Sequence, residues 1–76
     1  MVTPEQLKTW IESGFDNAQV EVEGDGHHFE AVIVAQEFEG RSRIQRHQLV
    51  YAALGDKMKA EVHALSMKTH TPDEAA

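Results

Sequence analysis

Five histidines are the residues of this chain best suited to metal chemistry, because the sequence contains no cysteine. Imidazole is a good ligand for iron, zinc or copper. No two of the five show the spacing of a complete zinc site, either four residues apart on a helix or in a tight cluster. They could supply part of a coordination sphere, and a partner would have to complete it. The five are His27, His28, His47, His63 and His70.

The residues alone leave a second interpretation open for each histidine. His27 and His28 follow a Gly-Asp-Gly turn, where polar residues are common. His47 falls on the apolar side of a predicted helix, which favours a partly buried, hydrogen-bonded side chain. His63 shares a strand face with two apolar residues, so a core or rim position is the simpler interpretation. His70 lies beside a turn and is expected to be an exposed loop residue.

Enzymatic chemistry finds little support in the sequence. There is no nucleophilic cysteine, no G-x-S-x-G elbow and no phosphate-binding P-loop. Nine acidic residues lie within positions 1–40, but their spacing singles out no catalytic pair, and a solvated acidic face explains them. We therefore expect a protein that is not an enzyme.

Charge is distributed unevenly along the chain. The net charge is −6, yet residues 1–40 carry −8 and residues 41–76 carry +2. An acidic whole argues against tight nonspecific binding to nucleic acid, which depends on neutralising many phosphates. Arg41, Arg43 and Arg46 nevertheless form a local basic segment. This segment leaves room for an acidic partner or a weak nucleic-acid contact.

Two helices should carry these residues. Thr3 can cap a helix over residues 4 to 13, with Pro4 at its first position, Gln6 completing a capping box and Gly14 as the stop. A second helix should begin after Ser42, with Gln45 in its capping box, and end at Gly55. Its predicted apolar face is made of the following residues: Ile44, His47, Tyr51 and Leu54, with Val50 beside them.

Three strands are predicted around the helices. "AQVEVE" alternates strictly between apolar and polar residues, which is typical of a half-buried strand. After the turn at residues 24–26, "HFEAVIVAQEF" should return beside it, and "EVHALSMKT" at residues 61–69 is the third strand. Thr71 to Glu74 repeats the capping signature, but the chain ends before a stable helix can form. The predicted order is α-β-β-α-β with a truncated or frayed helix start at residues 71–76.

At 76 residues the chain should form one small domain, spanning residues 1–76. No run of residues approaches the length of a membrane span, and the N-terminus shows no targeting pattern. We therefore expect a soluble cytoplasmic protein that does not bind membranes.

The joined motifs of the chain resemble those of the BolA-like protein family. "FEGRSRIQRHQLVYAAL" at residues 38–54 is similar to the family's F-x-G-x-S-x-x-x-R-H-x-x-V-y core. "VHALSMKTHTP" is similar to its following strand, and "GDGHHF" resembles the short hairpin of the bacterial IbaG or YrbA branch. The resemblance covers about residues 3–73.

This resemblance implies a fold and a partner. The implied fold is α+β, an α-β-β-α-β(-α) sandwich related to class II KH domains, with a three-stranded sheet and helices packed on one side. The implied partner is a monothiol glutaredoxin that shares a [2Fe-2S] cluster, with glutathione, across a heterodimer. His63 would supply the family histidine ligand, and His28 the ligand from the hairpin, with His27 as the alternative. No cluster is expected in the isolated chain, which should be a monomer or weak homodimer.

The resemblance also raises a second function, because some BolA-like proteins are described as transcription regulators. Arg41, Arg43, Arg46 and His47 would then contact DNA or a partner from the turn and helix at residues 41–47. A G-x-x-G loop of the RNA-binding KH type is absent from the sequence. Ala75 stands where the family often carries an aromatic residue, so the family's closing helix should be absent or truncated.

Overall fold

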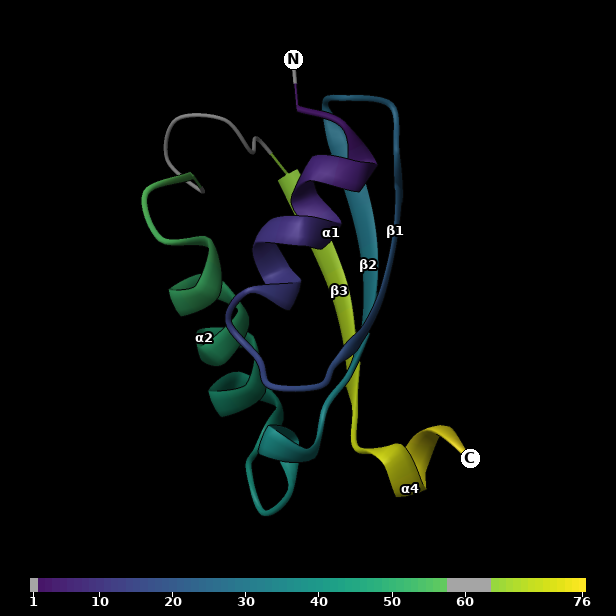
Figure 1. The fold of residues 1–76 in the computed structure, drawn as a ribbon, viewed down its shortest axis with the longest axis vertical. Helices are drawn as coiled ribbons and strands as arrows, with labels where there is room; N and C mark the ends of the chain where they lie inside the picture. The colour runs from purple at the N-terminus through teal and green to yellow at the C-terminus, as the bar shows by residue number, and fades with distance from the viewer. Residues whose placement is uncertain (1, 58–63) are drawn as a thin grey trace.

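The computed structural model of the chain describes residues 2–57 and 64–76 (Figure 1). The elements follow the predicted order of helix, two strands, helix and strand, and a short last helix closes the described chain. Their bounds are α1 Pro4–Glu12, β1 Gln19–Gly24, β2 His28–Val34, the 3-10 turn η1 Gln36–Phe38, α2 Arg43–Leu54, β3 Ala64–His70 and α4 Pro72–Ala75.

The three strands form one mixed sheet in the order β1-β2-β3. β1 and β2 are antiparallel across the hairpin, with Gln19 opposite Val34 and Gly24 opposite Phe29. β2 and β3 are parallel, and this pairing needs a crossover connection, part of which is α2. In Figure 1, α1 and α2 lie together on one side of the sheet. The predicted α+β fold, with a three-stranded sheet and helices on one side, is confirmed.

The core lies between this face of the sheet and the two helices. Alternate residues of β1 and β2 enter it, as the sequence pattern predicts. The neighbours of these residues on the opposite face stay largely exposed. The most deeply buried side chains, each 3% exposed or less, are Leu7, Ile11, Val20, Phe29, Ala31, Ile33, Ala35, Phe38, Val50 and Leu54.

Side-chain caps fix where each helix begins. The hydroxyls of Thr3, Ser42 and Thr71 accept hydrogen bonds from the backbone N–H three residues on. The side-chain oxygens of Gln6, Gln45 and Glu74, at those third positions, accept a hydrogen bond from the capping residue's own N–H. Each pair satisfies two helix-end donors that would otherwise lack partners. The predicted capping boxes are confirmed for α1 and α2, and the third forms even in the four-residue α4.

The second strand is shorter than predicted, because the chain turns before Phe38. β2 ends at Val34 and residues Gln36–Phe38 form a 3-10 turn. This turn carries the Phe38 ring into the core, where it meets the ring of Phe15 edge-on at 5.4 Å between centroids. The third strand extends one residue further than predicted, because β3 continues through His70. The prediction that His70 is an exposed loop residue was wrong, since its side chain is half-buried in the strand. Residues 61–63 of the predicted third strand lie outside the described residues.

The buried face of α2 differs from the predicted one. Val50 and Leu54 are buried, but Ile44 is 70% exposed and Tyr51 is 42% exposed. Apolar residues lie on more than one side of this helix, so their spacing did not identify the side that packs. The prediction that Ile44 and Tyr51 contribute to the core was wrong.

Gly14 acts through its size and not as a left-handed helix stop. α1 ends at Glu12 with Ser13 as its C-cap, and Gly14 does not have a positive φ. A β-carbon at Gly14 would overlap the β-carbon of Ala53 in α2. The missing side chain therefore allows the two helices to approach closely.

In the described ranges, no helix is long and apolar enough to cross a membrane.

Candidate functional site

The turn between β1 and β2 holds the two hairpin histidines by their backbones. The Asp25 Oδ1 atom accepts hydrogen bonds from the backbone N–H groups of His27 and His28, each at 2.9 Å. The bond from His28, followed by that from His27, lowers the pKa of Asp25 because both stabilise the charged carboxylate. Gly26 adopts a positive φ of 96°, which glycine accepts without strain. The start of the second strand is thus fixed by one side chain.

His28 is the first residue of β2, and its side chain is exposed. The next residue, Phe29, is buried in the core, so strand alternation puts His28 on the same face as Glu30, away from the helices. His27 lies one residue earlier, in the turn, and is also exposed. Both hairpin histidines are therefore accessible to a partner.

His63, the other predicted ligand, lies outside the described residues. The residue that follows it, Ala64, is the first residue of β3 and pairs with His28 in the parallel ladder. Among residues 2–57 and 64–76, no group of three or more histidine, cysteine, aspartate or glutamate side chains could hold a metal ion. The described part of the chain offers accessible imidazole, not a complete metal site.

The predicted basic segment lies at the opposite end of the sheet, before and within the first turn of α2. Gly40 makes a turn with a φ of 73°, and Arg41 and Arg43 are exposed on either side of the capping Ser42. The Arg41 Nε atom donates a hydrogen bond to the backbone oxygen of Glu37 at 3.0 Å. These two arginines are the accessible charges of the segment.

Arg46 is instead engaged within the protein. Its guanidinium forms a two-pronged ion pair with the Glu74 carboxylate, with Nη1–Oε1 and Nη2–Oε2 distances of 2.7 and 3.2 Å. It also donates to the backbone oxygens of Arg41 and Thr69, and lies over the Phe38 ring at 5.9 Å. The Arg46 side chain is 14% exposed.

This ion pair shifts the pKa values of both partners in the directions expected when a charged pair is stabilised. The hydrogen bond from Arg46, followed by that from the Thr71 N–H, lowers the pKa of Glu74 to about 2. The same bond raises the pKa of Arg46 further above its ordinary value. Arg46 therefore connects α2 to β3 and α4. The sequence predicted Arg46 to belong to one basic segment with Arg41 and Arg43. This prediction missed its structural role, because nothing in the local spacing signals a contact 28 residues away.

His47, the last member of the predicted basic surface, is half-buried on α2. This degree of burial agrees with its predicted position on the packed side of the helix. It lies one turn before the buried Val50 and is less accessible than the two exposed arginines.

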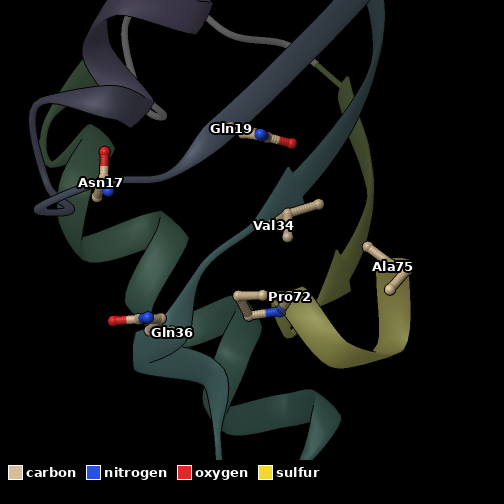
Figure 2. Close-up of a pocket in the computed structure, with 7 residues that line it drawn as sticks. Asn17, Gln19, Val34, Gln36, Pro72 and Ala75 are labelled. Carbon is tan, nitrogen blue, oxygen red and sulfur yellow. The ribbon is translucent and has the colours of Figure 1, made fainter.

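Figure 2 shows a hollow that the sequence did not indicate, beside α4. Its volume is about 380 Å³. The amides of Gln19 and Gln36 point to opposite sides in this view, so they do not converge on one ligand. The lining comes from three separate segments of the chain, at residues 17–19, 34–36 and 72–76, which explains the lack of a sequence motif. The lining residues are Asn17, Gln19, Val34, Gln36, Pro72, Ala75 and Ala76.

Comparison with known proteins adds a family match to this geometry. The model of the BolA-like protein family matches residues 1–74. A solved structure of a bolA protein homologue from Coxiella burnetii is 54% identical, with a TM-score of 0.92 over 99% of this chain and 97% of that one. The acid stress protein IbaG of Escherichia coli K12 is 41% identical over 72 residues, covering 93% of this chain and 86% of the relative.

A third relative carries a name that refers to DNA. The DNA-binding transcriptional regulator BolA of Haemophilus influenzae is 37% identical over 51 residues, which cover 67% of this chain and 50% of the relative. The matched region spans about half the length of some other curated relatives as well, including the human BolA-like protein 1.

Proposed function

Because the chain belongs to the BolA-like protein family, we propose that it is a non-enzymatic partner of a monothiol glutaredoxin. The two proteins would share a [2Fe-2S] cluster used in iron–sulfur trafficking or in sensing iron or stress. The observation that carries the proposal is the pairing of His28 with Ala64. Ala64 directly follows His63 in the sequence, so the parallel ladder supports a common end of the sheet for the two proposed ligands.

The donor set fits a shared cluster better than a resident one. The chain has no cysteine, and its described residues lack a complete metal-binding group. Two imidazoles would supply half of the four ligands that such a cluster takes, so a partner's thiolates have to provide the rest. Histidine ligation raises the reduction potential of a [2Fe-2S] cluster above that of an all-thiolate one.

Within this site the chain's own residues have separate tasks. Asp25 holds the backbone at His27 and His28, so a partner meets a preformed hairpin. The exposed His28 would be the hairpin ligand, and His27 remains the alternative. A ligating imidazole has to lose its proton. Acid should therefore weaken the complex by competing for the histidines.

Reconstitution with a monothiol glutaredoxin, glutathione and iron tests the proposal. The mixture should give a visible absorption spectrum different from that of the glutaredoxin alone, and His63→Ala should abolish the difference. His70→Ala is the matched control, because His70 ends the strand that follows His63. A spectrum unchanged by His63→Ala would remove His63 from the site, and no shared spectrum with the unaltered chain would contradict the proposed function.

A second candidate function is binding of DNA by the basic segment. Two observations favour it: the exposure of Arg41 and Arg43, and the name of the Haemophilus relative. Binding should weaken with salt, and Arg41→Gln or Arg43→Gln should each reduce the log–log salt slope by about 0.9 if the residue contacts a phosphate. The absence of measurable duplex binding at low salt would exclude this function.

A further inference from the structure

One side of α2 carries large apolar side chains that the fold does not use. Ile44 is 70% exposed and Tyr51 is 42% exposed, although the buried Val50 and Leu54 anchor this helix to the core. Ile44 and Tyr51 are seven residues apart, almost two helical turns, so they lie on one side of α2 about 10 Å apart along its axis. Gln48, also exposed, lies between them. We call these three residues the α2 stripe.

The charge around the α2 stripe is opposite to that of the chain as a whole. Residues 41–57 carry four basic residues and one acidic residue, for a net charge of +3, whereas the complete chain carries −6. Arg46 is already paired with Glu74, and Lys57 lies over the ring of Trp10 at 5.1 Å. Arg41 and Arg43 are thus the exposed basic residues next to the stripe, at its Ile44 end, where Glu39 is also exposed, and Asp56 is exposed beyond its Tyr51 end.

Such a surface suits a protein more than a nucleic acid. A phosphate backbone would use the two arginines but has little to offer an exposed Ile44 side chain. The third arginine of the segment, which would add phosphate affinity, is occupied by a carboxylate of the same chain. An interface with an apolar centre and a charged rim uses both parts of the surface.

We propose that the α2 stripe, with Arg41 and Arg43 at its edge, is a docking surface for a protein that presents an apolar patch bordered by carboxylates. This inference rests on the proposed function, since it identifies how the glutaredoxin partner would hold the chain apart from the cluster. In Figure 1, α2 runs alongside the sheet with its N-terminal end, which carries Arg43 and Ile44, away from the hairpin and its C-terminal end towards the hairpin and the start of β3. A partner that also reaches His28 therefore has to span the length of this helix.

The test measures association without a cluster. Isothermal titration of the unaltered chain with a monothiol glutaredoxin, in the absence of iron and glutathione, gives the reference affinity. Replacing Ile44 and Tyr51 together by serine should weaken binding at least about tenfold, as expected for the centre of an interface. Arg43→Glu should weaken it as well, and by less at high salt. Because all three side chains are exposed, the variants should keep the thermal unfolding of the unaltered chain.

Matched controls come from the opposite side of the molecule. Val32 is 37% exposed on the sheet face away from the helices, and Lys68 lies beside it on β3. Val32→Ser and Lys68→Glu repeat the same chemical changes there. Val32 lies on the same sheet face as His28 but about 13 Å further along β2, so these variants should weaken binding much less than the α2 variants. Equal weakening by the control variants would contradict a specific surface on α2.

The outcomes separate this inference from the function on which it rests. Binding that is unaffected by the α2 variants would overturn the docking surface but leave the glutaredoxin partnership standing. No binding by the unaltered chain, with or without a cluster, would overturn both. Binding of duplex DNA that needs Arg41 and Arg43 but ignores Ile44 and Tyr51, in a chain that binds no glutaredoxin, would assign this surface to nucleic acid instead.

Discussion

A single carboxylate organises the residues proposed to meet the cluster. The Asp25 carboxylate accepts hydrogen bonds from the backbone N–H groups of two successive residues, His27 and His28, and so fixes the start of β2. Local hydrogen bonds of this kind are typical of aspartate in turns. They hold the backbone but leave both imidazoles exposed. In the proposed site, the hairpin ligand would be whichever of the two neighbouring imidazoles faces the partner.

Separate alanine replacements should distinguish the two hairpin histidines. His28→Ala should remove the visible spectrum shared with glutaredoxin, because His28 begins the strand paired with Ala64, and His27→Ala should preserve it. Each variant is reconstituted in parallel and its absorption spectrum recorded. Neither change should affect folding, since both side chains are exposed.

The opposite result is equally informative. A spectrum lost only in His27→Ala would assign the ligand to the turn, and a spectrum retained in both variants would remove the hairpin from the site.

Two replacements of Asp25 separate the effect of its charge from that of its hydrogen bonds to the hairpin. Asp25→Asn keeps an acceptor oxygen for the two N–H donors but removes the charge, so it should disturb the hairpin less than Asp25→Ala.

Individual residues were predictable from the sequence where their partners are near in the chain. The turn at Gly26, the capping residues and the alternation of β2 depend on neighbours within three or four positions. Arg46 was not predictable, because its carboxylate partner is 28 residues away and its ring partner, Phe38, also required the tertiary fold. The same segment thus contains two exposed arginines and one structural arginine that look alike in the sequence.

At the scale of elements, the packing of α1 against α2 depends on one missing side chain. Gly14 follows α1 and meets Ala53, whose Cα lies 3.1 Å from the position that a β-carbon on Gly14 would occupy. Interiors this closely packed do not absorb an extra carbon freely. The glycine therefore sets the distance between the helices.

Gly14→Ala should destabilise the fold by about 1–3 kcal/mol, the usual cost of overpacking a close contact. The free energy of unfolding in urea measures the change. Ala53→Gly should itself cost about 1 kcal/mol, since glycine weakens a helix interior. In the double variant the two costs should sum to more than the measured loss, because Ala53→Gly removes the atom that the new methyl overlaps. Strict additivity would contradict the proposed contact.

Element positions followed from local sequence better than element faces did. α1 and α2 begin at their capping boxes as predicted, because the cap is a contact over three residues. The packed side of α2 was mispredicted, since apolar residues occur on several sides and only the sheet decides which are buried. β2 ends earlier than predicted for a similar reason. The turn after Val34 buries Phe38 in the core, and this burial stabilises a turn that strand propensity does not indicate.

At the scale of the whole molecule, the order of strands and the parallel pairing of β2 with β3 are beyond what the residue pattern specifies. The residue pattern predicted the order of helices and strands, whereas the resemblance to a known family implied the sandwich with helices on one side of a three-stranded sheet. The complete α2–β3–α4 arrangement also explains why the last turn forms at all. An isolated four-residue helix is unstable in water. Here α4 is tied to α2 by the ion pair between Arg46 and Glu74.

This ion pair should make the stability of the whole fold depend on acid in a defined range. The pKa of Glu74 is about 2 in the folded chain, below its ordinary value of 4.5. A folded pKa below the unfolded one means that the native state binds the proton more weakly. The contribution is therefore complete above about pH 4.5 and is lost as the pH falls from there towards 2. Salt should reduce this contribution, because the Glu74 side chain is 47% exposed.

Glu74→Gln isolates the charge, since glutamine can still complete the capping box with Thr71. The difference in free energy of unfolding between the unaltered chain and Glu74→Gln should be constant above about pH 4.5 and shrink towards pH 2. Asp73→Asn is the matched control, because it removes a carboxylate from the same turn and leaves the Arg46–Glu74 pair intact. If the difference between Glu74→Gln and the unaltered chain stays constant down to pH 2, the ion pair does not couple α4 to the stability of the fold. The same conclusion follows if Asp73→Asn shows the pH dependence expected of Glu74→Gln.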